Sequence, residues 1–395
     1  MPKKATWLWT AGAFIAFFIF GFADNMKGPT LPAMLDDLHF SYSLGGTILL
    51  ASYVGFVVAT LLTGLVSDVA GNKAVILVAG VSLLAGIAGY SSFATAGLLI
   101  AAMFVLGLGL GSLELGGNAI IVELHREKRG RYLNLLAVFH GLGSTVAPYY
   151  GGQLLAAGFS WRQVYRFSLA AIALLPLYFL FLRRPPHAPA RATPAGLRHL
   201  LGVAFRGAMP WLYLLIAAYV AAEIGLAAWM VEFLQKVKAQ PPVTSSLYLS
   251  LYFALIMVGR LVGSLLVERA GYLRALFIAS AASAACLAAG IYGPAALAFC
   301  LPLTGLFFSV IFPTTTAVAS ELYKENLGAI LGVLFTFGGL GGMLGPWLVG
   351  VLSDLFTLRA GLASMLGMCA LVLAALMALS RNAAAARRAA ALERG

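Results

Sequence analysis

The sequence predicts an all-α integral membrane protein of twelve transmembrane helices, arranged in two pseudo-symmetric six-helix bundles. The chain has 395 residues, of which 61% are hydrophobic and only 10% are charged. Soluble domains carry about a quarter charged residues, so a water-soluble globule is excluded. The apolar runs are about 20 to 28 residues long, enough to cross a hydrocarbon core ~30 Å thick. A motif repeated at half the chain length indicates that the helices form two similar sets.

The expected helices follow one another along the chain, six in each half. They lie near residues 7–33, 43–67, 73–93, 97–124, 131–157, 162–182, 209–235, 244–267, 272–292, 294–320, 327–355 and 358–380. Lys3 and Lys4 precede the first run, as in a signal sequence, but the run is too long and is interpreted as an uncleaved first helix. Membrane-spanning strands would alternate over segments of about ten residues, which excludes a β-barrel.

A polar stretch rich in Arg and Pro separates the two halves, between the sixth and seventh expected helices. Such composition is typical of a linker, and anionic lipid headgroups could also hold it at the membrane surface. The predicted organisation is an N-terminal bundle at 1–182, a cytoplasmic linker at 183–208, a C-terminal bundle at 209–380 and a cytoplasmic tail at 381–395.

The repeated motif supports a duplicated domain. It reads Phe139-x-Gly141-x-Gly143-x4-Pro148-x3-Gly152 and returns as Phe337-x-Gly339-x-Gly341-x4-Pro346-x3-Gly350, an offset of 198 residues. Nearly the same shift relates Asp24 to Glu223, Asp68 to Glu268 and Gly71 to Gly271. A period this long is found in secondary transporters rather than in solenoids.

The glycines and prolines of this motif have two possible roles. Small residues let membrane helices approach closely, and they also soften a helix that bends during a conformational cycle. Six positions in the fifth and eleventh helices are candidates for bending: Gly141, Gly143, Pro148, Gly339, Gly341 and Pro346. Both interpretations stay open at this point.

The net charge of +12 reflects membrane topology rather than nucleic-acid binding. With the N-terminus in the cytoplasm, nineteen of the 26 Lys and Arg residues fall on the cytoplasmic side and five on the other. That bias is the positive-inside rule. It predicts a multi-pass protein of the plasma (inner) membrane with both termini cytoplasmic.

The sequence offers no site for catalysis, a cofactor or a metal. Cys286, Cys300 and Cys369 lie in apolar stretches without ligand-type spacing, so we expect buried, inert thiols. An enzyme would need a nucleophile–base pair or a ligand cluster. A membrane-bound sensor is the other non-transporting alternative, but it would usually carry a soluble domain.

Four charged residues lie well inside apolar helices: Asp24, Lys27, Glu114 and Glu223. Each costs roughly 2.5–3.5 kcal/mol at a bilayer centre. Packing alone gives no reason for them, so we expect them to line a polar cavity between the halves. The alternative is a buried ion pair of Lys27 with Asp24 or Glu114 that only joins helices.

Spacing supports a shared face for these residues. Asp24 and Lys27 are three residues apart, and Glu114 and Asn118 are four apart, so each pair projects from one side of its helix. Further candidates for binding a solute are polar or aromatic. They are Asn25, His140, Trp229 and Phe312, and for the two aromatic residues ordinary packing is the alternative.

A second group of residues is expected to form a conformational clasp at the cytoplasmic ends of helices. Asp68 stands at a helix C-terminus, where the dipole disfavours an acid, so it needs a partner in an adjoining helix N-terminus or the 125–131 turn. A plain turn with a solvated charge is the alternative. The predicted clasp comprises Gly64, Asp68, Gly71, Lys73, Arg260, Glu268 and Arg269.

The stretch Gly64-x3-Asp68-x2-Gly71-x-Lys73 resembles the signature loop of the major facilitator superfamily, with Val69 and Asn72 where arginines are usual. Nearly the whole chain is similar to the fucose–galactose–glucose:proton symporter family. The matching stretches are Gly111-Ser-Leu-Glu114-x3-Asn118, Leu133-Asn134-Leu135-x3-Phe139, Tyr219-Val-Ala-Ala-Glu223, Gly259-Arg260-x2-Gly263 and Phe312-Pro313-Thr314.

The resemblance implies the major facilitator fold, alternating access and a proton carried by one embedded carboxylate. Glu114 falls on the essential acid of the family's fourth helix, whereas the second acid aligns with Gly28, one turn after Asp24. His140 replaces a usual Asn and Phe312 a usual Tyr. Lys27 could neutralise Glu114 and abolish coupling.

The functional prediction is proton-coupled import of a small polar solute, most simply a hexose-type sugar. Glu114 and Asp24 are the candidate proton-coupling residues, because burial disfavours a charged carboxylate. The alternatives are an exporter of drugs or lipophilic metabolites, an uncoupled uniporter, or a carrier of an anionic solute. The expected partners are the solute, protons and the lipid bilayer, with the protein as a monomer.

Overall fold

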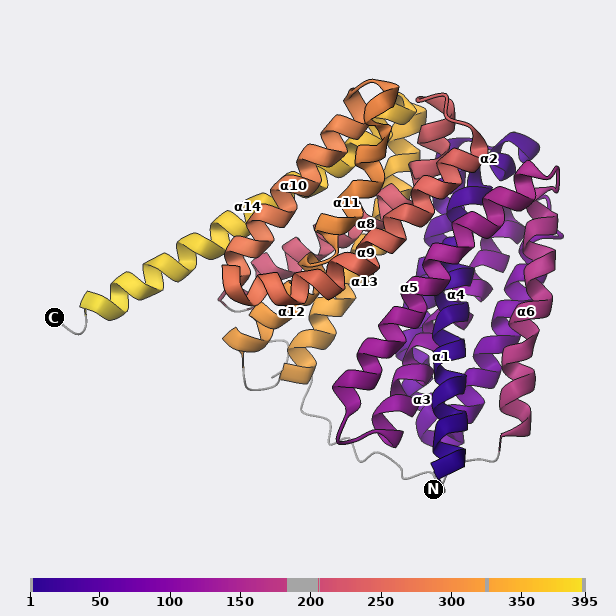
Figure 1. The fold of residues 1–395 in the computed structure, drawn as a ribbon, viewed down its shortest axis with the longest axis horizontal. Helices are drawn as coiled ribbons and strands as arrows, with labels where there is room; N and C mark the ends of the chain where they lie inside the picture. The colour runs from indigo at the N-terminus through magenta and orange to yellow at the C-terminus, as the bar shows by residue number, and fades with distance from the viewer. Residues whose placement is uncertain (1–2, 183–204, 206, 324–326, 393–395) are drawn as a thin grey trace.

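A computed structural model of the chain describes residues 3–182, 205, 207–323 and 327–392, and the described part contains helices and their connections but no strand. The helices form two bundles that stand side by side (Figure 1). We call the end at which the N-terminus lies the linker end, because α6 finishes there and α8 starts there. The opposite end, with the turns after residues 38, 156, 236 and 355, is the far end.

The N-terminal bundle contains the first six expected helices. Its elements are α1 (Lys3–Asn25), α2 (Lys27–Leu38), α3 (Tyr42–Tyr90), α4 (Ala96–Leu124), α5 (Arg129–Ala156) and α6 (Trp161–Phe181). The expected first helix is thus two helices that extend to Leu38. The physical reason is Pro29, which has no N–H to donate to the carbonyl of Asn25, where α1 ends.

The expected second and third helices are the two arms of α3. They meet at Gly71, whose φ of 81° and ψ of 163° lie outside helical space. That conformation is essentially restricted to glycine. Its repeat mate Gly271, between α9 and α10, has φ 81° and ψ 141°, so the same turn recurs in the second half.

The C-terminal bundle repeats this arrangement. Its elements are α8 (Met209–Lys236), α9 (Pro242–Ala270), α10 (Tyr272–Tyr292), the 3₁₀ turn η1 (Ala295–Phe299), α11 (Cys300–Phe308), α12 (Ile311–Leu322), α13 (Leu327–Leu355) and α14 (Leu358–Leu392). The expected tenth helix is divided into η1, α11 and α12. Pro313 lacks the N–H that would bond the carbonyl of Ser309, where α11 gives way to α12.

Eleven membrane spans in the described part meet the length and hydropathy that a bilayer requires. The one expected helix outside these eleven is the fifth, α5, whose 28 residues include Arg129 and Arg131 at its start and His140. Its polar composition, not its length, excludes it from these eleven spans. Contacts place α5 between α1 and α9, where protein rather than lipid surrounds its polar face. The predicted all-α fold of two six-helix bundles is confirmed.

The internal repeat is visible in the packing. Phe139 stacks on Phe14 with ring centroids 4.7 Å apart and an interplanar angle of 5°. Its mate Phe337 stacks on Tyr213 at 4.8 Å and 4°. The same pairing of rings therefore joins α1 to α5 and α8 to α13.

Glycines of the repeated motif bring these helix pairs into backbone contact. A Cβ added to Gly143 would lie 2.0 Å from the carbonyl oxygen of Phe18, and one added to Gly341 would lie 2.1 Å from that of Ala217. Close packing explains these two glycines. Bending at Gly141, Pro148, Gly339 and Pro346 stays a prediction.

The two bundles touch along two seams, α3 against α13 and α5 against α9. At the far end the contact is tight: a Cβ on Gly152 would lie 2.4 Å from Cβ of Ser246, and one on Gly350 would lie 2.4 Å from the carbonyl oxygen of Tyr42. Toward the linker end the seams loosen. Leu61 and its repeat mate Leu261 are 73% and 61% exposed, and the bundles diverge there (Figure 1).

Two glycines of one motif provide a matched test of the packing. Gly341→Ala should lower the free energy of unfolding by ~1–3 kcal/mol, because α8 and α13 must separate to admit the methyl group. In Gly339→Ala the new Cβ would lie 3.5 Å from Cγ2 of Val57, an ordinary contact, so we expect no loss. Thermal unfolding in detergent measures both, and equal losses would contradict the assignment.

Candidate functional site

A narrow cavity lies between the two bundles, at the depth where the seams begin to loosen. α1, α2 and α3 supply one wall, and α8 and α9 supply the other. The lining residues are Asp24, Asn25, Lys27, Gly28, Leu49, Tyr53, Ile224, Ala227, Ala228 and Leu249. The chain thus places its embedded charges of α1 and α2 at an interface between the halves, rather than against lipid.

Lys27 is the most completely surrounded charge in this cavity. Its Nζ donates to Oδ1 of Asp24 at 2.6 Å and to Oγ of Ser52 at 3.3 Å. It also lies 4.6 Å from the ring centroid of Tyr53. The side chains of Lys27 and Asp24 are only 6% and 15% exposed. Of the two partners proposed from the sequence for Lys27, the structure pairs it with Asp24.

The other two embedded acids belong to the same region. Glu114 of α4 is partly exposed and lies within electrostatic range of Asp24. Glu223 of α8 is partly exposed as well, and Arg260 of α9 acts on it electrostatically. Tyr53 is within range of both Asp24 and Glu223. Of the three acids only Asp24 lines the cavity. That all three share one space, and their roles in transport, stay predictions.

Three more candidates lie on the helices of the N-terminal bundle, and only Asn25 of them lines the cavity. His140 packs its ring 4.6 Å from that of Phe20 and lies within electrostatic range of Asp24 and Arg260. Asn118, one turn after Glu114, is partly exposed. Asn25 lines the cavity, but its Nδ2 donates to the carbonyl of Gly21 at 2.9 Å and to Oγ of Ser144 at 3.0 Å, so it also ties α1 to α5.

The two aromatic candidates pack against protein in this state. Trp229 is fully buried and donates its Nε1 to the carbonyl of Pro346 at 2.8 Å. It also meets Tyr42 edge-on, with centroids 5.6 Å apart. Phe312 stacks on Phe335 at 5.5 Å. Neither is placed against the cavity by these contacts.

The predicted clasp is only partly described. Lys73 donates its Nζ to the carbonyls of Leu180 at 3.0 Å and Leu182 at 2.5 Å, so it caps the C-terminal end of α6. Arg260, Glu268 and Arg269 are exposed. The side chain of Asp68, and Gly64 with it, lie outside the described residues.

Sequence analysis missed the polar contact beside this clasp. Asn72 accepts a hydrogen bond at Oδ1 from Oγ of Ser67 at 2.7 Å. Its Nδ2 donates to Oε2 of Glu123 on α4 at 3.0 Å. In the superfamily's signature loop an arginine usually stands at the position of Asn72. This departure from the motif was the signal in the sequence that could have indicated the contact.

The contacts that close the far end were also missed. Asp354 of α13 accepts hydrogen bonds from the backbone N–H groups of Tyr42 at 2.9 Å and Ser43 at 2.7 Å, at the N-terminus of α3, where an anion is favourable. Lys236 of α8 pairs with Asp36 of α2 at 2.8 Å. Both contacts cross from one bundle to the other.

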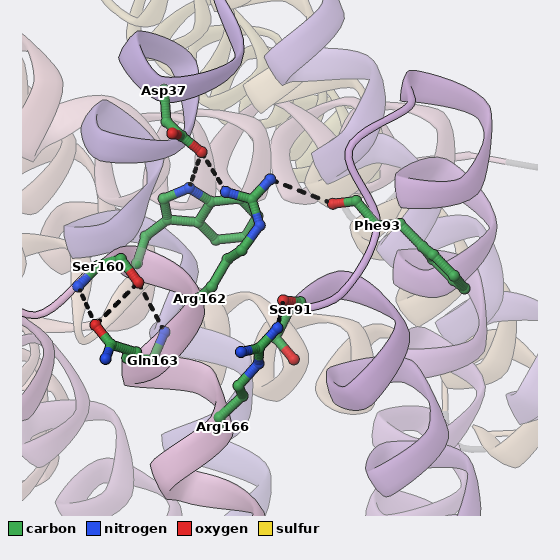
Figure 2. Close-up of polar contacts among 8 residues, drawn as sticks. Asp37, Ser91, Phe93, Ser160, Arg162, Gln163 and Arg166 are labelled. Carbon is green, nitrogen blue, oxygen red and sulfur yellow. Dashed lines mark hydrogen bonds and ion pairs between the residues drawn. The ribbon is translucent and has the colours of Figure 1, made fainter.

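A separate polar cluster holds the far end of the N-terminal bundle together (Figure 2). Asp37 of α2 accepts hydrogen bonds from Nε1 of Trp161 at 3.0 Å and from Arg162. Arg162 also donates to the carbonyl of Phe93 at 3.4 Å. Because α2, α6 and the turn after α3 meet here, the cluster makes this part of the bundle one unit.

Two six-helix bundles that enclose partly exposed charges at their interface define a membrane transporter. The chain belongs to the Major Facilitator Superfamily, whose family model matches residues 13–302 and 241–394. The resemblance inferred from the signature loop is thereby confirmed.

Relatives and solved structures cover nearly the full length of the chain. A Helicobacter pylori protein named "Putative glucose/galactose transporter" is 26% identical over 386 residues, 90% of this chain and 92% of its own. A "Glucose/galactose transporter" of Brucella abortus is 23% identical over 363 residues, 86% of each chain.

The solved structures support the fold. The D-xylose-proton symporter superposes with a TM-score of 0.76 at 15% identity, over 94% of this chain and 96% of that one. The transporter FucP in the outward conformation has a TM-score of 0.63 at 19% identity, over 93% and 97%.

We expect Lys27 and Asp24 to be strongly coupled in their contribution to the stability of the protein. Lys27→Met should destabilise the protein because it strands the Asp24 carboxylate. The loss is about 3–5 kcal/mol for a fully buried pair, and less here because Asp24 keeps 15% exposure. Adding Asp24→Asn should recover most of it.

Thermal unfolding of the two single variants and the double variant closes the cycle. Lys236→Met is the matched control, since its ion pair is 42% and 63% exposed and should contribute ~1 kcal/mol or less. If the losses in the two single variants add up to the loss in the double variant, Lys27 and Asp24 are not coupled.

Proposed function

We propose that the protein is a secondary active transporter that imports a hexose-type sugar together with protons. The observation that carries the proposal is the buried Lys27–Asp24 pair in the cavity between the bundles, in a chain whose relatives are named as glucose/galactose transporters. Carboxylates accept hydrogen bonds from sugar hydroxyls and can also bind a proton. The family's fold supplies the two bundles that alternate around such a site.

Glu114 is the proposed proton carrier. It lies in α4 and is partly exposed, and its carboxylate has no hydrogen bond or ion pair to the other described residues. Asp24, by contrast, has Lys27 as a fixed counter-ion at 2.6 Å. Binding a proton at Glu114 removes the cost of a charge in a low-dielectric site, which lets the loaded transporter close and reopen toward the other side.

The basic linker end is proposed to face the cytoplasm. The excess of Lys and Arg on that side follows the positive-inside rule, and it supports a cytoplasmic position for both termini of a plasma-membrane protein. In this orientation the seams are closed toward the outside and loosened toward the cytoplasm, as expected of an inward-facing state. We infer that the transporter acts as a monomer, since one chain contains both halves of the site.

The pair of Lys27 and Asp24 is proposed to bind the sugar together with Glu223. Lys27 and Asp24 come from the N-terminal bundle, and Glu223 comes from the C-terminal one. A sugar held by both bundles would draw them together, which is the coupling that alternating access requires.

Glu114→Gln provides the test of the proton carrier. Purified protein in proteoliposomes should lose accumulation of labelled glucose or galactose driven by a pH gradient, because the amide cannot take up a proton. Exchange of labelled for unlabelled sugar should continue, since it needs no net proton movement.

Glu127→Gln is the matched control, because Glu127 is an exposed carboxylate in the turn at the linker end. It should accumulate sugar like the unmodified protein. Full pH-driven accumulation by Glu114→Gln would refute the role of Glu114. Transport of neither hexose by the unmodified protein would refute the sugar assignment.

A further inference from the structure

A fourth acid is buried away from the central space, at the closed far end. Glu232 lies near the C-terminus of α8, and its side chain is only 1% exposed. It is not part of the proton pathway proposed above. A carboxyl group this deeply buried is rarely retained without a partner or a function.

The hydrogen bonds of Glu232 are incomplete. Its Oε1 accepts a hydrogen bond from the hydroxyl of Tyr42, 3.2 Å away on α3 of the other bundle. Its Oε2 is buried and has no hydrogen-bond partner among the described residues. An ionised carboxylate needs both oxygens solvated or bonded, so this environment suits the neutral acid better than the anion.

The charged groups around Glu232 do not compensate for an anion there. Lys236, one turn later on α8, is the nearby cation, but its Nζ is bound to both carboxylate oxygens of Asp36 of α2 at 2.9 and 2.8 Å. Asp354 of α13 adds a second carboxylate beside Tyr42, bonded to the N-terminus of α3. The base nearest to Glu232 is thus already paired, and a further carboxylate lies beside Tyr42.

We propose that Glu232 is a second proton-binding site, occupied while the far end is closed and emptied when it opens. The inference rests on the proposed alternating access, because it requires the far end to open. Opening moves Tyr42 of α3 away from α8 and admits water to both carboxylate oxygens. The hydrated carboxylate then releases its proton to the outer solution.

The direction of the pH effect follows from linkage. The closed far end binds one proton more than the open one, so lower pH favours closure. For a single proton, the ratio of closed to open molecules changes by at most about tenfold per pH unit. The effect vanishes where both states are protonated or both are ionised.

Distances between spin labels test this proposal. Labels at Ser92→Cys and Phe356→Cys, both exposed at the far end on opposite bundles, report its opening by pulsed electron resonance in lipid nanodiscs. The three free cysteines, Cys286, Cys300 and Cys369, are first replaced by Ala. The short-distance population of the labelled protein should grow as the pH falls.

Glu232→Gln keeps the shape of the side chain and mimics the neutral acid. We expect its far end to stay mostly closed, with the Glu232-dependent step in the pH titration lost. Asp37→Asn is the matched control, because Asp37 belongs to a cluster within one bundle and should leave that step unchanged. A full pH response in Glu232→Gln would overturn the proposal.

Two further variants keep the result decisive. Tyr42→Phe removes the hydroxyl that stabilises an ionised Glu232, so the step should move to higher pH even if Glu232→Gln folds poorly. Glu114→Gln should retain the step. If Glu114→Gln abolishes the entire pH response, the second proton site at Glu232 is refuted, while the proposed role of Glu114 stands. If Glu114→Gln loses sugar transport but keeps the pH step, the site at Glu232 is supported.

Discussion

The cost of placing charge in hydrocarbon is the constraint on which this structure depends. Each embedded charge costs roughly 2.5–3.5 kcal/mol facing lipid, so the fold must bring these residues together where protein and water surround them. Asp24 and Lys27 satisfy each other at 2.6 Å, with Ser52 and Tyr53 completing the shell around the ammonium group. The two bundles together form the scaffold that separates this ion pair from the lipid.

Glycine contacts differ between the packing within each bundle and the packing between the two bundles. Within each bundle, a Cβ at Gly143 or Gly341 would meet backbone at 2.0–2.1 Å, so helices there are locked together. Between bundles at mid-depth, a Cβ at Gly141 or Gly339 would find its neighbour at 3.4–3.5 Å. Gly28 of α2 is an exception between the bundles, since its Cβ would lie 2.4 Å from Cδ2 of Leu249 on α9. The seams therefore combine tight and ordinary contacts, whereas backbone contact within each bundle resists sliding.

The sequence predicted the helices and their duplication because both rest on local or repeated patterns. It placed the first and tenth helices as single elements, although Pro29 and Pro313 each remove one helical hydrogen bond. The placement of Asp24 and Lys27 in a cavity between the bundles was anticipated from the cost of charge in lipid. The contact of Tyr42 with Glu232 was not, because it joins residues 190 apart with no periodicity, and a charge near a helix end looks like an ordinary interfacial residue.

Duplication made the two halves alike in backbone but not in charge. Asp24 has Lys27 three residues later, whereas its repeat mate Glu223 has Leu226 at that position and so lacks a cation one turn away on its own helix. The N-terminal acid therefore keeps its counter-ion within its own bundle, on α1 and α2. Among the described residues Glu223 forms no ion pair. A symmetric scaffold with this unequal pairing leaves only the N-terminal acid with a counter-ion fixed in the cavity between the bundles.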